Sequence, residues 1–146
     1  MKNYQHKGID YISAKIVDSN LVLTHDQAAK LKSQFRSNGA CLKNAFNTAK
    51  LTDSMCVEGF VYCLMPCGKG ADEKIIRHCW NSKNGKYFDV TKDFIWSNDD
   101  REKEFYYFIV AEYAYGDYLK DTNNKIEFLS NVATIAKEID NMLGTN

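Results

Sequence analysis

Proline is nearly absent from this chain, which has a single one, Pro66, among its 146 residues. The sequence also has no internal repeat, no low-complexity tract and no stretch with the composition of a linker. A globular chain of this length can bury about 70% of its extended surface, which is enough for a real core. We therefore expect a single domain that spans residues 1–146.

Long apolar runs and an excess of charge of one sign are also missing. No apolar run approaches the ~18 residues of a membrane span, and residues 1–10 lack the apolar segment of an export signal. Nineteen basic residues balance nineteen acidic ones, so net charge gives no general attraction to nucleic acid or an anionic membrane. We expect a cytoplasmic protein with no nucleic-acid partner and no membrane partner.

Aromatic residues and cysteines are what the chain does have. Nine Tyr, eight Phe and two Trp argue against disorder, which goes with few aromatics. The cysteines are odd in number, and without an export signal reduced thiols are the default. They lie at positions 41, 56, 63, 67 and 79. A disulfide framework is therefore not expected. The cysteines are instead candidates for a reactive thiol or for a metal site.

A zinc site is one of these two possibilities. Cys63, Cys67, His78 and Cys79 are its possible ligands. Their spacing lacks the close cysteine pairs of structural zinc sites, and adjacent residues on a strand point to opposite faces. We expect no metal and no cofactor, and a zinc-stabilised interaction domain is the alternative.

Two helices are expected in the first third of the chain. Thr24 and Gln27 form a capping box in front of a helix over residues 25–36. A second helix begins near Ala40, with Cys41 in its first turn. Apolar residues at helical spacing predict its buried stripe. They are Leu42, Ala45, Phe46 and Ala49.

Residues that favour strands dominate the middle of the chain. Residues 56–64 predict a strand, and residues 65–72 predict a loop. Residues 74–82 and 86–91 predict two strands around Asn84-Gly85, which is the strongest short hairpin signal. A β-hairpin is therefore expected there.

The two ends of the chain carry the remaining elements. Short strands are expected at residues 11–17 and 21–23, and a longer one at residues 105–113, where a helix is the alternative. Apolar residues at helical spacing predict a closing helix over residues 123–143. This order indicates an α+β fold in which N-terminal helices pack on an antiparallel sheet.

Cys41 has the surroundings that a thiol nucleophile needs. At a helix N-terminus, free N–H groups and the positive end of the helix dipole stabilise a thiolate and lower its pKa. Gly39 and Ala40 directly before it are small, and leave a substrate carbonyl room to approach backbone N–H groups that stabilise an oxyanion. The alternative is a structural cysteine that packs as a small apolar residue.

The hairpin brings a histidine and a carboxylate together. A two-residue turn at Asn84-Gly85 pairs Lys83 with Lys86. His78 and Asp89 then lie on one face as diagonal neighbours, about 7–8 Å apart at Cα, within reach of one hydrogen bond. A three-residue loop would put them on opposite faces. The register of this hairpin therefore predicts a base with an orienting acid.

Four segments, in order, resemble those of the transglutaminase-like cysteine hydrolases, a superfamily related to papain. Residues 39–45 resemble its nucleophile helix, and residues 57–61, Val-Glu-Gly-Phe-Val, resemble the strand that follows. His78-Cys79-Trp80 resembles its His-Ala-Trp strand, and residues 85–91 resemble its Gly-x-x-x-Asp-x-Thr strand. Cys79 stands where alanine is usual, and Asp-Val-Thr replaces the frequent Asp-Pro-Thr. Neither departure removes a catalytic atom.

The resemblance implies a papain-like core with Cys41 as nucleophile, His78 as general base and Asp89 as orienting acid. It also implies Gln34 as an oxyanion donor, as in papain-like enzymes; a solvated helix face is the alternative. Trp80 is expected in the core or as one wall of the substrate cleft, beside Gly39 and Ala40.

The expected activity is thiol-dependent acyl transfer on an amide in a protein, a peptide or a small molecule. Hydrolysis, deamidation and transfer to an amine share its first half. The alternative is a non-catalytic module of the same fold that docks a protein through the aromatic-rich residues 94–118.

Overall fold

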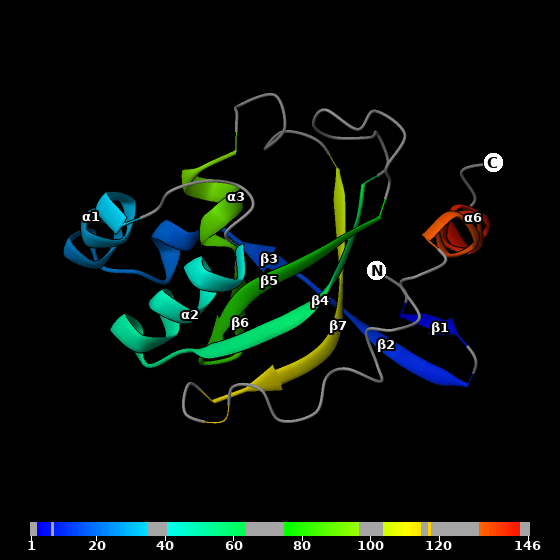
Figure 1. Cartoon of the computed structure of the whole chain (residues 1–146), viewed down its shortest axis with the longest axis horizontal. Helices are drawn as coiled ribbons and strands as arrows, with labels where there is room; N and C mark the ends of the chain where they lie inside the picture. The colour runs from blue at the N-terminus through cyan, green and yellow to red at the C-terminus, as the bar shows by residue number, and fades with distance from the viewer. Residues whose placement is uncertain are drawn as a thin grey trace.

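The computed structural model describes residues 3–6, 8–34, 41–63, 75–96, 104–114, 117 and 132–143. Within them, helices accompany a seven-stranded sheet, which confirms the α+β class (Figure 1). The strands are β1 (Tyr4–His6), β2 (Ile9–Ala14), β3 (Ile16–Val17), β4 (Met55–Cys63), β5 (Ile75–Lys83), β6 (Lys86–Phe88) and β7 (Phe105–Tyr113). The helices are η1 (Ser19–Leu21, a 3-10 turn), α1 (His25–Gln34), α2 (Cys41–Thr52), α3 (Val90–Phe94) and α6 (Val132–Leu143).

The sheet is not antiparallel throughout. Its strand order is β1-β2-β7-β4-β5-β6-β3, and the β3–β6 pair is parallel while the other pairs are antiparallel. An even number of antiparallel pairings separates β2 from β6, so these two strands point the same way. Since β3 continues in the direction of β2, it meets β6 in parallel, and the expectation of a purely antiparallel sheet is wrong.

Side chains on the sheet pack into separate apolar clusters. One lies under α6 and is rich in aromatic rings, with Phe60, Phe108 and Ile139 buried in it. A second holds Val57, Val61, Trp80 and Tyr107 on the opposite side of β4. A third, around Leu31 and Phe88, joins α1 to β6 and α3. Helices α1, α2 and α3 therefore gather at one end of the sheet, and α6 lies at the other (Figure 1).

Helix α1 begins with the capping box that the sequence predicts. The Thr24 N–H donates to Gln27 Oε1 at 2.9 Å, and the Gln27 N–H donates to Thr24 Oγ1 at 3.1 Å. Residues 35–40, which include the expected end of this helix, lie outside the described residues. The predicted start of this helix is confirmed by its own side chains.

Helix α2 begins at Cys41, but its buried face differs from the predicted stripe. Ala45 and Ala49 are buried, whereas Leu42 is exposed. The remaining buried positions are polar: Asn44, Thr48 and Thr52. Asn44 bonds Thr91 of α3, whereas the hydroxyls of Thr48 and Thr52 donate to carbonyls of α2 itself. Polar residues can therefore lie on the buried face, and the stripe read from apolar residues alone is partly wrong.

The hairpin between β5 and β6 has the predicted turn. Lys83 pairs with Lys86, and Asn84 and Gly85 both have positive φ angles, 51° and 77°. Asn-Gly suits such a turn because Gly adopts positive φ without strain and Asn tolerates it. The pairing ends at Phe88, however, and Asp89 is the N-cap of α3. A strand over residues 89–91 is therefore wrong.

The ends of the chain were predicted less well. A strand at residues 105–113 is confirmed as β7, and the helical alternative is wrong. The strand at 11–17 is divided at Lys15 into β2 and β3. Residues 21–23 form no strand, because Asp18 accepts a hydrogen bond from the Asn20 N–H and caps η1 instead. Helix α6 covers residues 132–143 of the predicted 123–143.

Gly59 sits where β4, β5 and β7 come closest. A Cβ atom there would overlap the carbonyl oxygen of Phe108 and lie 2.7 Å from the ring of Trp80. The β4–β7 register also shifts between Glu58 and Gly59. Glycine is therefore required here by close backbone approach, and Gly59 is the partner of His78 in the β4–β5 pairing.

No helix among the described residues is long and apolar enough to cross a membrane.

Candidate functional site

Cys41 is the first residue of α2 and is partly exposed. The N–H groups of the first helical turn have no partner within the helix, and their partial positive charge favours a thiolate over a thiol. The sequence places no acidic residue in that first turn. The thiol is therefore partly open to solvent at a position that favours its ionised form.

His78 and Asp89 form a buried pair. His78 Nε2 lies 2.7 Å from Asp89 Oδ2, and the two residues are 3% and 0% exposed. The pair forms although Asp89 belongs to the cap of α3 and not to a strand. Because Nε2 faces Asp89, Nδ1 is the nitrogen left to exchange a proton with another group. This is how a carboxylate orients a catalytic histidine.

The Asp89 carboxylate has two further donors. The hydroxyl of Tyr107 donates to Oδ2 at 2.7 Å, and the N–H of Lys92 donates to Oδ1 at 3.2 Å. Burial alone would raise the pKa of Asp89, but the charge of His78 and these hydrogen bonds lower it below its ordinary value. Asp89 is therefore ionised and fixed in one orientation.

Aromatic rings enclose the imidazole of His78. Trp80 stacks on it with ring centroids 6.2 Å apart, and Trp96 lies at 5.5 Å. Trp80 is fully buried in the cluster with Val57 and Tyr107. In this structure it therefore supports the histidine from the core and does not form a wall that a substrate touches.

Two side chains of β5, Cys79 and His78, lower the pKa of the Cys41 thiol. The Cys79 thiol contributes most to lowering the pKa of Cys41, and the hydrogen bond and charge of His78 add to it. Burial acts in the opposite direction, and the resulting pKa is about 4. Cys41 is accordingly a thiolate at neutral pH.

His78 is the matching cation. Burial alone would lower its pKa, but the negative charge of Asp89 and its hydrogen bond raise it, followed by the hydrogen bond and charge of Cys41. The pKa of His78 becomes about 10. Cys41 and His78 thus form a thiolate–imidazolium pair across neutral pH.

A hydrogen bond between buried side chains joins helix α2 to helix α3. The side-chain amide of Asn44 donates to Thr91 Oγ1 at 3.1 Å, and both residues are buried. On its other flank, the amide of Asn81 donates to the carbonyl of Ala45 at 2.8 Å. These bonds hold the nucleophile helix against the strand that carries His78 and the helix that Asp89 caps.

The other expected site residues are placed less centrally. Gln34 is exposed at the end of α1, beside Lys43 and Asn47 in a surface hollow. No hydrogen bond in the described part of the chain joins it to Cys41 or His78. Gly39 and Ala40 lie outside the described residues.

The cysteines expected as alternative zinc ligands do not gather in the described part of the chain. No group of three or more potential ligands from His, Cys, Asp and Glu occurs there. Cys67 lies outside the described residues.

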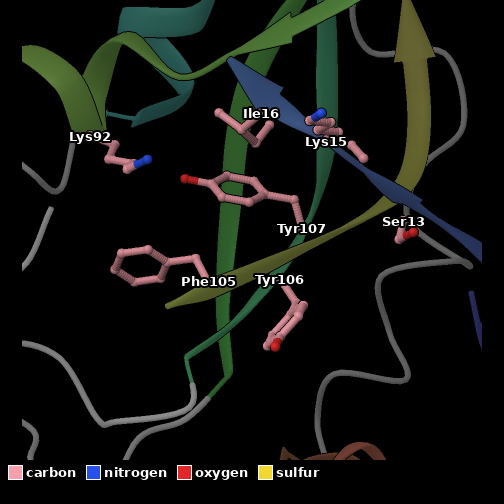
Figure 2. Close-up of a pocket in the computed structure, with 8 residues that line it drawn as sticks. Ser13, Lys15, Ile16, Lys92, Phe105, Tyr106 and Tyr107 are labelled. Atoms are coloured by element: carbon pink, nitrogen blue, oxygen red, sulfur yellow. The ribbon is translucent and has the colours of Figure 1, made fainter. Parts of the chain in front are cut away.

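A cleft of about 540 Å³ is lined in part by Tyr107, the residue that donates to Asp89 (Figure 2). Tyr107 and Phe105 from β7 face Ile16 and Lys92 across it, and the Lys92 amino group points toward the Tyr107 hydroxyl. Since Tyr107 donates to Asp89, this cleft shares a side chain with the His78–Asp89 pair.

Sequence reasoning missed two of these contacts. Tyr107 is one of several aromatic residues in β7, and no local signal pairs it with Asp89. Cys79 stood out only as a departure from the usual alanine.

Comparison with protein-family models, curated proteins and solved structures finds no match for this chain.

Proposed function

We propose that this protein is a thiol-dependent acyl-transfer enzyme with a Cys-His-Asp triad on a papain-like or transglutaminase-like core. The observation that carries the proposal is the buried His78–Asp89 pair beside a partly exposed cysteine at a helix N-terminus. A thiolate, a base and a group that orients the base are the requirements for covalent thiol catalysis.

In the proposed reaction, the Cys41 thiolate attacks the carbonyl carbon of an amide. A C–S bond forms, and the carbonyl π electrons move to oxygen, where N–H groups of the first turn of α2 stabilise the charge. The C–N bond then breaks as His78 gives its Nδ1 proton to the leaving amine. Water or a second amine attacks the thioester, gives a proton back to His78 and releases Cys41.

Asp89 stays ionised through these steps. It holds Nε2 of His78 and stabilises the imidazolium, while Tyr107 and the Lys92 N–H hold Asp89. The substrate class is an amide in a protein, a peptide or a small molecule.

The test is the pH dependence of Cys41 alkylation by iodoacetamide. Trypsin releases Cys41 on residues 37–43, Cys79 on residues 78–83, and Cys56, Cys63 and Cys67 together on residues 51–69. Mass spectrometry of these peptides therefore follows Cys41 alone. We expect Cys41 to react well below pH 8, before the other thiols, and His78→Ala to remove that advantage.

Matched variants separate the triad from general effects on the fold. His25→Ala, at an exposed histidine of α1, should leave the Cys41 profile unchanged. A panel of peptide and small-molecule amides then tests turnover. An inert Cys41, or one that reacts as a free thiol whatever occupies position 78, would count against the enzyme and favour a protein-binding module. In that module Tyr107, Phe108, Val110 and Tyr113 would supply no surface, because they are buried.

A further inference from the structure

The nucleophile has a second thiol beside it. Cys79 follows His78 on β5, and α2, which begins with Cys41, packs on that strand (Figure 1). Asn81, two residues after Cys79 on the same face of β5, donates to the carbonyl of Ala45, which lies one turn after Cys41 in α2. The two thiols, both free, therefore lie on the facing sides of this helix–strand contact. Cys79 is only 6% exposed, whereas Cys41 is partly exposed. An oxidant from solution therefore meets Cys41 before it meets Cys79.

The surroundings of the two thiols are unequal, and a buried carboxylate, Glu58, is part of the difference. It lies opposite Cys79 in the β4–β5 pairing, is 6% exposed, and its Oε2 has no hydrogen-bond partner among the described residues. The hydrogen bond to Cys41, burial, and the charges of Cys41 and Glu58 all raise the pKa of Cys79. The pair is thus one thiolate that can be oxidised and one protonated thiol held against it.

We propose that Cys41 and Cys79 form a reversible disulfide when a hydroperoxide oxidises Cys41. The inference rests on the proposed function only in taking Cys41 as the reactive thiol, and does not require that the protein turn over amides. Formation of the disulfide would remove the nucleophile and so switch off acyl transfer.

The chemistry has two balanced steps. The Cys41 thiolate attacks one oxygen of the hydroperoxide, the O–O bond breaks, and Cys41 becomes a sulfenic acid while the peroxide is reduced to hydroxide or alkoxide. The Cys79 sulfur then attacks the Cys41 sulfur, and the S–O bond breaks. The leaving hydroxide takes the Cys79 proton and departs as water.

The disulfide with Cys79 would also prevent irreversible oxidation of Cys41. A sulfenic acid without a nearby thiol is oxidised further to sulfinic and sulfonic acids, which thiol reductants do not reverse. A disulfide, in contrast, is returned to two thiols by dithiothreitol. Cys79 would therefore protect the nucleophile as well as switch it off.

Peptide mapping tests the proposal directly. The full chain is treated with hydrogen peroxide, free thiols are blocked with N-ethylmaleimide, and the protein is digested with trypsin without reduction. We expect a species that joins residues 37–43 to residues 78–83, loss of the blocked Cys41 peptide, and recovery of both thiols after dithiothreitol. The other three cysteines share residues 51–69, so this link is unambiguous.

Two variants sharpen the result. Cys79→Ser keeps a hydroxyl beside Cys41 but cannot form the bond, so peroxide should drive Cys41 to sulfinic acid that dithiothreitol does not restore. Cys56→Ser should behave as wild type, because Cys56 bonds the Ala45 carbonyl instead. A link from Cys41 to residues 51–69, or sulfinic acid at Cys41 in the wild type, would overturn the proposal.

The two proposals fail separately. A linked peptide without amide turnover would leave the disulfide standing and remove the acyl-transfer function. Amide turnover without a linked peptide would do the reverse.

Discussion

Both oxygens of the Asp89 carboxylate are hydrogen-bonded, and the donors come from three separate parts of the chain. His78 and Tyr107 bond Oδ2, and the Lys92 N–H bonds Oδ1. At the scale of single residues, this convergence holds one imidazole in place. Cys41 also depends on more than one neighbour, because Cys79 and His78 both lower its pKa.

Cys79→Ala should raise the pKa of Cys41, because the hydrogen bond from Cys79 is the largest cause of its lowering from 9.0 to about 4. The iodoacetamide profile of Cys41 should shift to higher pH, and Cys79→Ser should shift it less because the hydroxyl still donates. The control is Cys56→Ala, which removes a thiol that is not beside Cys41. Identical profiles for wild type and Cys79→Ala would show that the two sulfurs do not interact.

Tyr107→Phe should remove the hydrogen bond to Asp89 Oδ2 and leave the packing of the aromatic ring unchanged. The loss of one buried hydrogen bond to a carboxylate should cost about 2 kcal/mol of unfolding free energy. The pKa of Asp89 should rise, so the lowest pH at which iodoacetamide alkylates Cys41 should be higher than in the wild type. The matched control is Tyr106→Phe on the same strand, whose hydroxyl bonds the exposed Glu104. Equal effects of the two variants would contradict a positioning role for Tyr107.

At the scale of elements, the position of Cys41 relative to His78 depends on how α2 is fixed. The buried face of α2 carries Asn44, Thr48 and Thr52 as well as alanines, and its polar contacts reach both α3 and β5. Such contacts fix the position of a helix more narrowly than apolar packing alone, because a shift of the helix leaves buried polar groups without partners.

Asn44→Ala tests this attachment. It removes the bond to Thr91 Oγ1 and leaves that buried hydroxyl without its Asn44 donor, so we expect a loss of about 1–3 kcal/mol in urea unfolding. The reactivity of Cys41 at neutral pH should fall as well. Asn47→Ala is the matched control, since Asn47 lies on the same helix and lines a surface hollow. An Asn44→Ala variant as stable as Asn47→Ala would show that the bond to Thr91 contributes little.

At the scale of the whole molecule, the site joins α2, β5, β7 and the N-terminus of α3. None of these elements holds more than one member of the triad, so the site exists only when the sheet order is complete. The charges of the site are likewise properties of the folded state. Relative to the unfolded chain, folding raises the pKa of His78 from 6.5 and lowers that of Cys41 from 9.0.

These opposite shifts predict a pH effect on stability. Between pH 6.5 and pH 9.0, the folded chain holds one proton more on His78 and one fewer on Cys41 than the unfolded chain does. The two changes cancel, so this pair should add no slope to unfolding free energy against pH. In Cys41→Ala only the raised pKa of His78 remains. Its stabilisation is complete below pH 6.5 and declines as pH rises, so the variant should lose stability relative to wild type across this window.

Urea unfolding at a series of pH values checks that prediction. Cys56→Ala is the control, because the folded Cys56 thiol, with its pKa raised to about 11, stays protonated across most of the window. Its curve should run nearly parallel to that of the wild type. Parallel curves for wild type and Cys41→Ala would show that no thiolate–imidazolium pair forms.

The local structure of this protein was determined largely by the sequence itself. The capping box of α1, the start of α2 at Cys41 and the Asn84-Gly85 turn all follow from residues within a few positions of one another. Each depends on backbone preferences and short-range hydrogen bonds, which the neighbouring side chains settle without help from the rest of the chain. The turn also fixed the Lys83–Lys86 pairing.

The contacts across the sheet were decided only by the tertiary structure. Asp89 leaves the strand to cap α3, and Tyr107 reaches Asp89 from a strand 18 residues further along the chain. The burial of Trp80 and the parallel meeting of β3 with β6 likewise depend on sheet order. Order among distant strands is set by the packing of the whole core. No local pattern of side chains encodes it. The sequence left Trp80 either in the core or at the cleft, and gave no sign of the bond from Tyr107 to Asp89.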